Sequence, residues 1–572
     1  MTENETAKET MPVGRPNIYV QSLTFNDGKI LPVNKNDIVV FVGPNNVGKS
    51  QTLKDIQSKA LSNDPTVILD TVDYSSDPHF SYQKWLDSIA VKRKDQYGNY
   101  EYDEMNVKIP RSLFNVFRKS KILNRLSELI ICLLKTEDRL TMADPPENIN
   151  LDMPASHPIH LLCRNSTFRK KVSERFEKAF GVPIIPFKQF GNTTPLILGK
   201  FPVLSKIPSD EIEREEFVSS ILSQYPHLEN QGDGMRSFVG LMLYLIIDHY
   251  NIFLIDEPEA FLHPPQARIM GETIGDLLSN EQQAFVSTHS IHFIQGLLEK
   301  CPKRVKVVRI TRVDGTNSFS GLDQTRILEL SKDPFLKYSN VLEGLFYKNV
   351  VLCEADADCM FYSMINGASD MKGAKSADTL FIHCGGKHRM AAVARVLRDL
   401  NVDFRVVPDF DIFDDKNTLK NLVEDCGGTW NEFDSDYIVL SKDIQNREKN
   451  DMSGQDLITK ISNIVDLNAP VSRNKRKAIR KFLDNVKFEW DRLKEGGKTG
   501  VSSGEPRKAC DSLLERMKNV GIHVVPCGEL EQFVPDCDGH GPPWIQNVLD
   551  KHPDLSDPVF AEAKSFVKSW NL

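Results

Sequence analysis

Closely spaced cysteine pairs are absent from the sequence, although the chain contains ten cysteines in 572 residues. Scattered cysteines argue against a zinc ribbon or a disulfide framework and are typical of a reducing compartment. Apolar runs are short, and none approaches the roughly 18 residues that a membrane-spanning helix requires. Residues 1–15 are polar and acidic, unlike a signal peptide, so we expect a disordered lead there. These absences predict a cytoplasmic protein with no membrane contact.

The chain also lacks an excess of positive charge, since its formal net charge is −8. It therefore has no global attraction to nucleic acid, and any DNA contact must come from a local basic patch. The densest basic run is RNKRKAIRK at residues 473–481. Such a run is compatible with a solvated helix face and with a surface that contacts DNA.

A phosphate-binding loop is the first positive signal. Residues 43–50 read GPNNVGKS and fit the pattern G-x-x-x-x-G-K-[ST], between the β-branched run 38–42 and a helix-compatible stretch. Glycines let backbone N–H groups turn toward the phosphates of ATP, Lys49 adds a positive charge, and Ser50 offers its hydroxyl to Mg2+. The nucleotide-binding residues expected here are Gly43, Asn45, Asn46, Gly48, Lys49, Ser50 and Gln51.

Further parts of an ATPase follow in the order typical of the ABC class. An apolar strand at residues 252–256 ends in Asp256 and Glu257. Asp256 is expected to hold Mg2+, and Glu257 to orient or deprotonate the attacking water. His289 ends another strand and resembles the switch histidine of ABC ATPases, and the loop around Gly234 resembles their signature loop. The pieces together predict an ABC-type ATPase domain.

The separation between Lys49 and Asp256 is far longer than a compact nucleotide-binding core needs, so we expect an inserted region. We assign residues 16–80 and 200–320 to the ATPase domain and residues 81–199 to a mainly helical, dimerising insertion. Apolar residues recur at helical spacing over residues 113–134, with basic residues between them. This pattern favours an amphipathic helix packed on its own domain over a DNA-binding helix.

A second group of carboxylates has no role in an ATPase. The apolar strand 349–353 ends at Glu354 and is followed by Asp358, and the strand 403–407 is followed by Asp409 and Asp411. Carboxyl ends of parallel strands share one edge of a sheet, so these acids are expected to converge. Clustered carboxylates are costly unless metal neutralises them, and bound cations stabilise the charge of a scissile phosphodiester. Solvated loop-tip acids or helix caps are the alternative interpretation.

A Glu after one strand and an Asp-x-Asp after a later strand resemble the Toprim fold of topoisomerases, primases and related nucleases. Ala355 stands where many members carry glycine. An ABC ATPase followed by a Toprim domain is similar, over nearly the whole chain, to the OLD (overcoming lysogenization defect) nuclease family. Further matches are GGK at residues 385–387 and PCGELE at residues 526–531.

The resemblance implies an α/β fold: an ABC-type P-loop ATPase domain with a helical insertion, then a Toprim domain with a Rossmann-like parallel sheet. The Toprim domain would span residues 321–572 and carry a helical insertion at about 445–500. It implies a two-metal site for Mg2+ or Mn2+, with Glu354, Asp409 and Asp411 as catalytic residues. Its ligands would be Glu354, Asp358, Asp409 and Asp411, with Glu529 or Glu531 in addition. A late basic residue would lie near the scissile phosphate, with Lys564 as the candidate.

The implied activity is ATP-regulated, metal-dependent cleavage of DNA in bacterial defence against phage. ABC signature loops complete the ATP site of a partner subunit, so we expect a homo-oligomer, either a dimer or a tetramer. Members of the family act alone, beside a helicase in Gabija-like systems, or beside a reverse transcriptase with its DNA–RNA product in retrons.

Two other classes stay open. A DNA repair or structural-maintenance ATPase with a non-catalytic acidic scaffold would show a long heptad run between the ATPase halves, and the sequence has none. A topoisomerase-like strand passer would need a nucleophilic tyrosine near the carboxylates. Tyr347 and Tyr362 flank the first strand of that region, although tyrosines there are more often packing residues.

Overall fold

The computed structural model divides into two compact units, Met1–Phe346 and Tyr347–Leu572. The lead expected at residues 1–15 lies outside the described residues. The structure describes residues 16–75, 80–94, 100–104, 107–110, 122–150, 155–187, 192–200, 224–247, 250–313, 315–321, 340–369, 378–448, 453–465, 470–484 and 489–570, with a few positions between 210 and 220.

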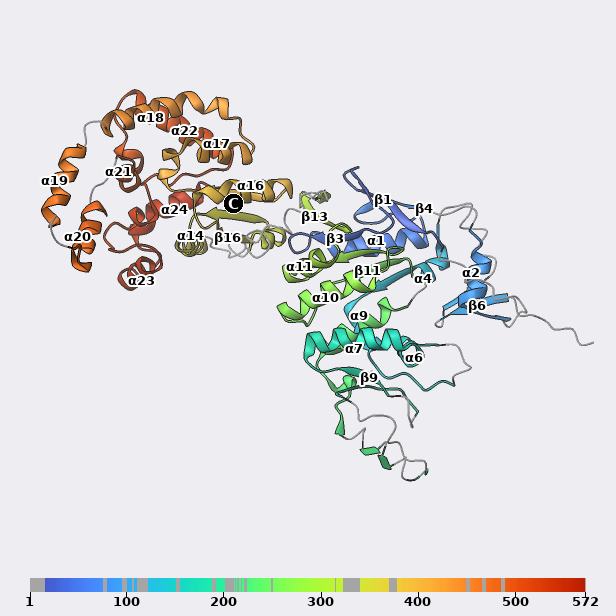
Figure 1. Cartoon of the computed structure of the whole chain (residues 1–572). Coiled ribbons are helices and arrows are strands. Elements are labelled where there is room, and N and C mark those ends of the chain that lie inside the picture. Colours follow the sequence, from blue (N-terminus) through green and yellow to red (C-terminus); the bar gives the residue numbers. More distant parts are fainter. Residues whose placement is uncertain are drawn as a thin grey trace, which may run out of the picture. The chain divides into compact units, whose positions relative to one another are not determined.

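The first unit is built around a six-stranded sheet in the order β14-β13-β3-β12-β11-β8 (Figure 1). Its strands are β3 (Ile38–Val42), β8 (Ile131–Leu134), β11 (Ile252–Asp256), β12 (Gln283–Ser287), β13 (Val305–Val313) and β14 (Thr316–Gly321). All neighbours are parallel except β13 and β14. Every residue of β3 and β12 is buried, as expected for central strands that are covered on both faces. The carboxyl ends of β3, β12, β11 and β8 therefore share one edge.

Helices and a smaller antiparallel sheet surround this central sheet. The small sheet has the order β2-β1-β4, with β1 (Tyr19–Phe25), β2 (Ile30–Pro32) and β4 (Leu69–Ser75). The helices are α1 (Lys49–Leu61), α2 (Tyr82–Ile89), α4 (Ser127–Ile130), α5 (Thr136–Met142), α6 (Pro158–Arg164), α7 (Ser166–Phe180), α9 (Asp233–Leu245), α10 (Pro264–Leu277) and α11 (Ile291–Lys300). Strand β9 (Ile184–Pro186) pairs antiparallel with β10 (Leu196–Leu198).

Residues 81–199 contain the helices α2, α4, α5, α6 and α7, but the described part is not helical throughout. They contain an antiparallel sheet of β5 (Val91–Lys94), β6 (Tyr100–Glu104) and β7 (Val107–Pro110), and β8 pairs with β11 inside the central sheet. The helix expected over residues 113–134 is replaced in its described part by α4 and β8, and residues 113–121 lie outside the described residues. Burial of β8 beside β11 outweighs the helical periodicity of the sequence, because pairing in a buried sheet overrides local preference.

The second unit contains a three-stranded parallel sheet in the order β16-β15-β17. Its strands are β15 (Asn349–Cys353), β16 (Thr379–His383) and β17 (Asp403–Val407). An aromatic core that includes Phe361, Trp544 and Trp570 packs beside β15. The helices are α14 (Asp356–Ser369), α16 (Lys387–Asp399), α17 (Lys416–Asp425), α18 (Asp434–Glu448), α19 (Gly454–Ile464), α20 (Arg473–Asp484), α21 (Glu489–Gly496), α22 (Glu505–Asn519), α23 (Pro542–Lys551) and α24 (Ala561–Lys568).

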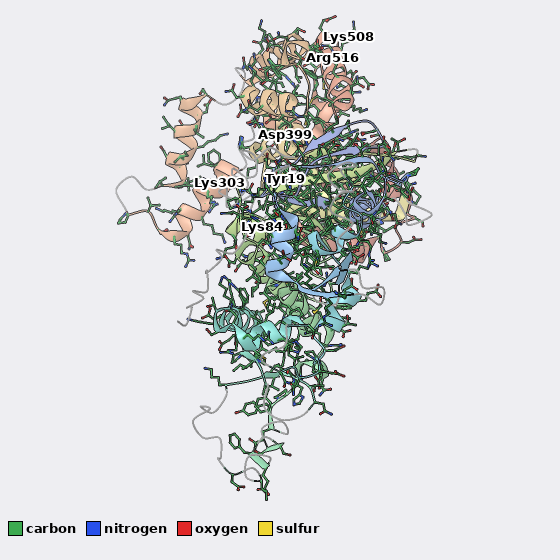
Figure 2. The ribbon with its side chains drawn as sticks, turned by 90° about the vertical axis from the view of Figure 1, so that its right-hand side faces the viewer. Tyr19, Lys84, Lys303, Asp399, Lys508 and Arg516 are labelled. Atoms are coloured by element: carbon green, nitrogen blue, oxygen red, sulfur yellow. The ribbon has the colours of Figure 1, made fainter. Side chains whose placement is uncertain are left out.

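Helices α19, α20 and α21 lie where the sequence predicts a helical segment at about 445–500, and in Figure 1 α19 and α20 stand apart from the sheet of this unit. Helix α22 packs beside α18, where Arg516 Nη2 lies 3.7 Å from Asp436 Oδ2. Arg516 and Lys508 of α22 are labelled in Figure 2. Among the described helices, none combines the length and the apolar character needed to span a membrane.

Candidate nucleotide site and carboxylate cluster

The phosphate loop lies between β3 and α1, and two of its glycines are required by its geometry. Gly43 and Gly48 have positive φ angles of 140° and 99°. A Cβ at Gly43 would lie 2.4 Å from the carbonyl O of Ile310, and one at Gly48 would lie 2.0 Å from Ile68 Cδ1. The loop is therefore held close to its neighbours in a conformation that other residues adopt only with strain.

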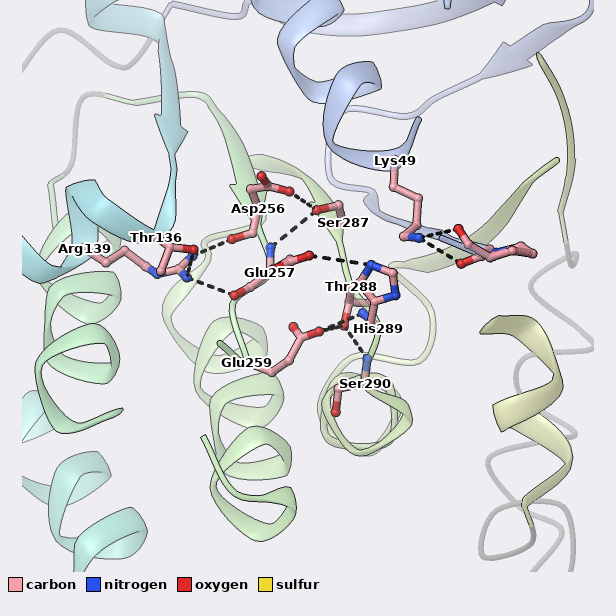
Figure 3. Close-up of polar contacts among 12 residues, drawn as sticks. Lys49, Thr136, Arg139, Asp256, Glu257, Glu259, Ser287, Thr288, His289 and Ser290 are labelled. Atoms are coloured by element: carbon pink, nitrogen blue, oxygen red, sulfur yellow. Dashed lines mark hydrogen bonds and ion pairs between the residues drawn. The ribbon is translucent and has the colours of Figure 1, made fainter. Parts of the chain in front are cut away.

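Lys49 begins α1 and turns back over the loop. Its Nζ donates to the carbonyl O atoms of Gly43 and Pro44, each at 2.8 Å (Figure 3). Burial lowers the pKa of Lys49 to about 8, although Glu257 and two nearby acids oppose this shift. The ammonium group thus lies buried where phosphates would approach a helix N-terminus, an arrangement that suits an anionic ligand.

The other loop residues differ in their surroundings. Asn45 and Asn46 are exposed, and Asn46 has a φ of 62°. Ser50 lies in the first turn of α1, where a hydroxyl can reach a cation beside the phosphates. The side-chain amide of Gln51 donates to Asp55 Oδ1 at 2.8 Å, so in this structure it is bonded within α1.

Asp256 and Glu257 form a tightly held turn at the end of β11. Asp256 Oδ1 accepts a hydrogen bond from Ser287 Oγ, and the Glu257 N–H donates to Ser287 O at 3.0 Å. Glu257 has a φ of 47°, in the left-handed region. Strain of this kind persists only where surrounding groups impose it. On the other side of the turn, the carbonyl O atoms of Asp256 and Glu257 accept from Arg139, which the sequence analysis did not identify.

His289 lies beside this turn. Its Nε2 is 3.6 Å from Glu257 Oε1. Burial, together with Lys49, lowers the pKa of His289 to about 4, so the imidazole is neutral near pH 7. Glu259 Oε1 accepts from Thr288 Oγ1 at 2.8 Å and from the His289 N–H at 2.7 Å. Glu259 therefore positions the segment that carries His289.

Gly234 lies in the first turn of α9, the helix that follows the signature-like loop. A Cβ there would be 2.6 Å from the carbonyl O of Phe261, which explains why a residue with a side chain does not fit. Phe261 has a φ of 66° and is 56% exposed. Ser237, one turn further along α9, is only 1% exposed and accepts a hydrogen bond from Arg139 Nε at 3.1 Å. Near the start of α9, Phe261 is thus exposed and Gly234 half-buried, whereas Ser237 is buried.

In the second unit, Glu354, Asp409 and Asp411 lie together at the carboxyl ends of β15 and β17. Glu354 Oε1 accepts from the Asp409 N–H at 3.2 Å. Lys494 Nζ lies 3.7 Å from Asp409 Oδ2 and 3.4 Å from Asp411 Oδ2, and Lys387 Nζ lies 3.3 Å from Asp411 Oδ2. The strand ends thus bring three carboxylates together, two of them paired with Lys494 and one of these also with Lys387.

The electrostatics of this cluster are those of crowded, partly buried acids. Burial and the charge of Asp411 raise the pKa of Glu354 to about 7. Burial and Glu354 raise the pKa of Asp409. Burial lowers the pKa of Lys494, but Asp411 and Asp409 outweigh it and the pKa is raised. Among the described residues, Asp411 Oδ1 is buried without a hydrogen-bond partner. An orphaned oxygen among acids with raised pKa values fits a site for a cation.

Asp358 lies at the start of α14 beside these acids. It is 8% exposed, and its Oδ2 accepts from the Ala355 N–H at 2.9 Å. Burial raises its pKa. In this structure Asp358 caps its helix, and its other oxygen is the one that could face a cation.

Lys494 is the basic residue that the sequence analysis missed. It comes from α21, whose backbone is in close contact with the loop at residues 526–528. A Cβ at Gly528 would lie 2.0 Å from the carbonyl O of Lys494, and a Cβ at Gly497 would lie 2.2 Å from Pro526 O. Lys564, the candidate named from the sequence, instead donates to the carbonyl O of Leu555. The feature of the sequence that could have indicated Lys494 is the pair Gly497 and Gly528, which allows α21 to approach the loop at residues 526–528.

Glu529 and Glu531 lie on the same loop, together with His540. The ligand atoms of these three residues lie within 4.8 Å of one another. Glu531 Oε1 is 2.7 Å from His540 Nδ1 and accepts from the Gly541 N–H at 3.0 Å. Sequence reasoning named both glutamates but not His540. Carboxylate and imidazole ligands together suit Mn2+ and Zn2+ better than Mg2+.

The structure also describes the surroundings of Tyr362 and of the basic run in helix α20. Tyr362 is 1% exposed and stacks edge-on against Trp570, so its hydroxyl is a packing group and not an accessible nucleophile. Helix α20 carries the basic run 473–481, and its charged side chains are mostly exposed.

Comparison with known proteins bears on the first unit. A family model described as "AAA ATPase domain" matches residues 204–294. No curated protein shows significant similarity to the chain. The chain is similar to an Smc head bound to the C-winged helix domain of ScpA, with 15% identity and a TM-score of 0.34 over 54% of this chain and 99% of that one.

Two other similar structures are also Smc heads. One is from Pyrococcus furiosus, with an extended coiled coil and bound to the C-terminal domain of ScpA (12% identity, TM-score 0.32, covering 55% of this chain and 98% of that one). The other is from Thermotoga maritima (11% identity, TM-score 0.28, covering 54% of this chain and all of that one). The family match and the geometry of the phosphate loop together indicate that the first unit contains an ATPase domain.

Proposed function

We propose that the chain is an ATP-regulated, divalent-metal-dependent DNA endonuclease, in which an ABC-type ATPase precedes a Toprim nuclease domain of the OLD type. The observation that carries the proposal is the convergence of Glu354, Asp409 and Asp411 around Lys494. An ATPase needs no such cluster, because its own carboxylates lie at the end of β11.

In this function Glu354, Asp409 and Asp411 would hold a divalent cation, with Asp358 beside them. Glu529 and Glu531 would hold a second one. Bound metal would supply positive charge for the attacking and leaving oxygens of the phosphodiester. Lys494 forms ion pairs with Asp409 and Asp411 in this structure. When a cation binds these carboxylates instead, we assign Lys494 the role of neutralising the charge of the scissile phosphate. This replaces Lys564 in the proposed mechanism.

The ATPase would act as the regulator. Lys49, Ser50 and the phosphate-loop backbone would bind ATP with Mg2+, and Asp256 and Glu257 would act on the cation and the attacking water. Gly234 and the exposed Phe261 would face nucleotide bound to a second copy, which makes the functional form a homo-oligomer. A role in defence against phage, alone or beside a helicase or a retron reverse transcriptase, belongs to this proposal.

The proposed domains have the boundaries expected from the sequence, with two changes. Strand β8 is part of the ATPase sheet, and the boundary between the two units lies at residues 346–347.

DNA would be contacted by the exposed basic face of α20, which belongs to the same unit as the carboxylates. Strand passage through Tyr362 is disfavoured because that side chain is buried, whereas Tyr347 is half-buried.

The direct test is incubation of the purified chain with supercoiled plasmid, with Mg2+, with Mn2+, and with a chelator. The proposal predicts nicked or linear product with metal and none with chelator, measured both with and without ATP. Absence of cleavage under every metal and nucleotide condition, by a chain that hydrolyses ATP, would reject the nuclease and leave an ABC-type ATPase with an acidic scaffold.

A further inference from the structure

Arg139 of α5 is fully buried in the first unit, with 0% of its surface exposed. Its guanidinium group donates four hydrogen bonds, to groups on α5, on α9 and at the end of β11. Figure 3 shows the bonds to Thr136, Asp256 and Glu257. The acceptors are Asp256 O at 2.7 Å, Glu257 O at 2.9 Å, Thr136 Oγ1 at 3.2 Å and Ser237 Oγ at 3.1 Å. A buried cation is tolerated when its donors are matched in this way, and the planar fork of arginine can serve several acceptors at once.

The bond to the Glu257 carbonyl matters because of the backbone there. Glu257 has a φ of 47°, a conformation that an L-residue keeps only when its surroundings impose it. Its N–H is held by Ser287 O at 3.0 Å, and its carbonyl O is held by Arg139. Both polar backbone groups of Glu257 are therefore fixed. The position of the Cα atom, from which the carboxylate side chain extends, is fixed with them.

Arg139 is also tied to the signature helix. Its Nε bond to Ser237 reaches α9, and the backbones of α5 and α9 touch. A Cβ at Gly240 would lie 1.9 Å from the carbonyl O of Arg139. Because the helices are in direct backbone contact, a displacement of α9 must move Arg139 or break its bonds.

We propose that Arg139 is a positioning residue that couples the signature helix α9 to Asp256 and Glu257. Through this link, a shift of α9 that accompanies engagement of nucleotide alters the position of the Glu257 carboxylate, and hydrolysis depends on the state of α9. Arg139 contacts neither nucleotide nor water in this role and acts through Glu257. The inference rests on the ATPase and is independent of the proposed nuclease.

The test uses Arg139→Lys in the full chain, because lysine keeps the charge and loses the fork. Arg304→Lys is the matched control. Arg304 donates to the backbone carbonyls of Asn36, Leu278, Ser279 and Gln282, none of which lies in the ATP site. We expect Arg139→Lys to lower kcat for ATP hydrolysis about 30-fold and to leave KM and the Kd of a fluorescent ATP analogue within about threefold. Arg304→Lys is expected to lower the melting temperature and leave kcat within about twofold.

Ser237→Ala gives a second, milder variant that keeps both bonds to the carbonyl groups. It removes only the link to α9, so we expect kcat to fall about threefold to tenfold with unchanged ATP affinity. If Arg139→Lys does not fold, Ser237→Ala decides, and an unchanged kcat overturns the proposal. The proposal also fails if folded Arg139→Lys retains wild-type kcat, if the loss is confined to KM, or if Arg304→Lys lowers kcat equally.

Discussion

The two sites of this chain hold their carboxylates in opposite ways. In the ATPase unit Asp256 and Glu259 each have protein donors of their own: Ser287 for Asp256, and Thr288 with the His289 N–H for one oxygen of Glu259, whose other oxygen is buried without a partner among the described residues. In the second unit, Glu354, Asp409 and Asp411 crowd together, Asp409 and Asp411 share Lys494, and Lys387 pairs with Asp411. One Asp411 oxygen also lacks a partner among the described residues. Acids held apart by separate donors are arranged to orient a ligand, whereas acids crowded around shared lysines require a cation to neutralise them.

Lys49→Ala should have the largest effect, and only on the ATPase. It removes the charge that lies over the phosphate loop, so ATP hydrolysis should fall by about 1000-fold or more, as expected for loss of charge stabilisation at a transferring phosphoryl group. Metal-dependent cleavage of plasmid without ATP should continue, because the carboxylate cluster has separate ligands. Phosphate release measures ATP hydrolysis, and plasmid nicking measures DNA cleavage. ATP hydrolysis at the wild-type rate by this variant would contradict the assignment of two separate sites.

Lys494→Ala should lower DNA cleavage by about 100-fold, because a positive group among the acids would be lost next to the scissile phosphate. Lys564→Ala is the matched control and should keep cleavage within about threefold, since Lys564 is bonded to the Leu555 carbonyl. Initial rates with saturating Mn2+ distinguish the two variants. Equal losses would show that Lys494 has no special role.

The pH dependence of stability should reveal the crowding around Glu354. Its pKa is raised from 4.5 to about 7, so the folded chain binds this proton more tightly than the unfolded chain does. The contribution of Glu354 to stability therefore falls as pH rises from about 4.5 to about 7 and stays low above that. In chelator at pH 8, Glu354→Gln should stabilise the second unit by about 1–3 kcal/mol.

That gain should vanish near pH 4.5, where the wild-type carboxyl is protonated. Melting curves of the two proteins across this pH range provide the measurement, and added Mg2+ should stabilise the wild type more than the variant. A stability difference that does not change with pH would contradict the assignment of a crowded, partly buried acid.

The smallest effects should come from the basic face of α20. Lys477→Ala and Lys481→Ala should each weaken DNA binding by about threefold to tenfold and reduce the slope of log K against log salt by about 1. Lys508→Ala, which changes an exposed lysine on α22, is a control of equal charge. Fluorescence anisotropy at several salt concentrations measures both quantities, and equal losses for Lys508 and Lys477 would indicate only a general charge effect.

The sequence was sufficient to locate the phosphate loop and the strand-end acids, because each is encoded by adjacent residues and a short strand. Residues that join these sites from distant segments were not predictable in this way. Lys494 reaches the acids only because Gly497 and Gly528 allow two backbone segments to touch, and Arg139 lies beside Asp256 only because α5 packs against α9. Strand β8 was missed because its periodicity is helical in the sequence, while its pairing with β11 is set by the fold.

The central claim is that the acids at the carboxyl end of β17 form the nuclease site. It is tested most directly by plasmid cleavage with Asp409→Ala and with Asp403→Ala, which removes an exposed acid at the opposite end of the same strand. The account predicts that Asp409→Ala loses metal-dependent cleavage while ATP hydrolysis stays within about twofold of wild type, and that Asp403→Ala keeps both activities. Cleavage by Asp409→Ala at the wild-type rate, with and without ATP, would contradict it.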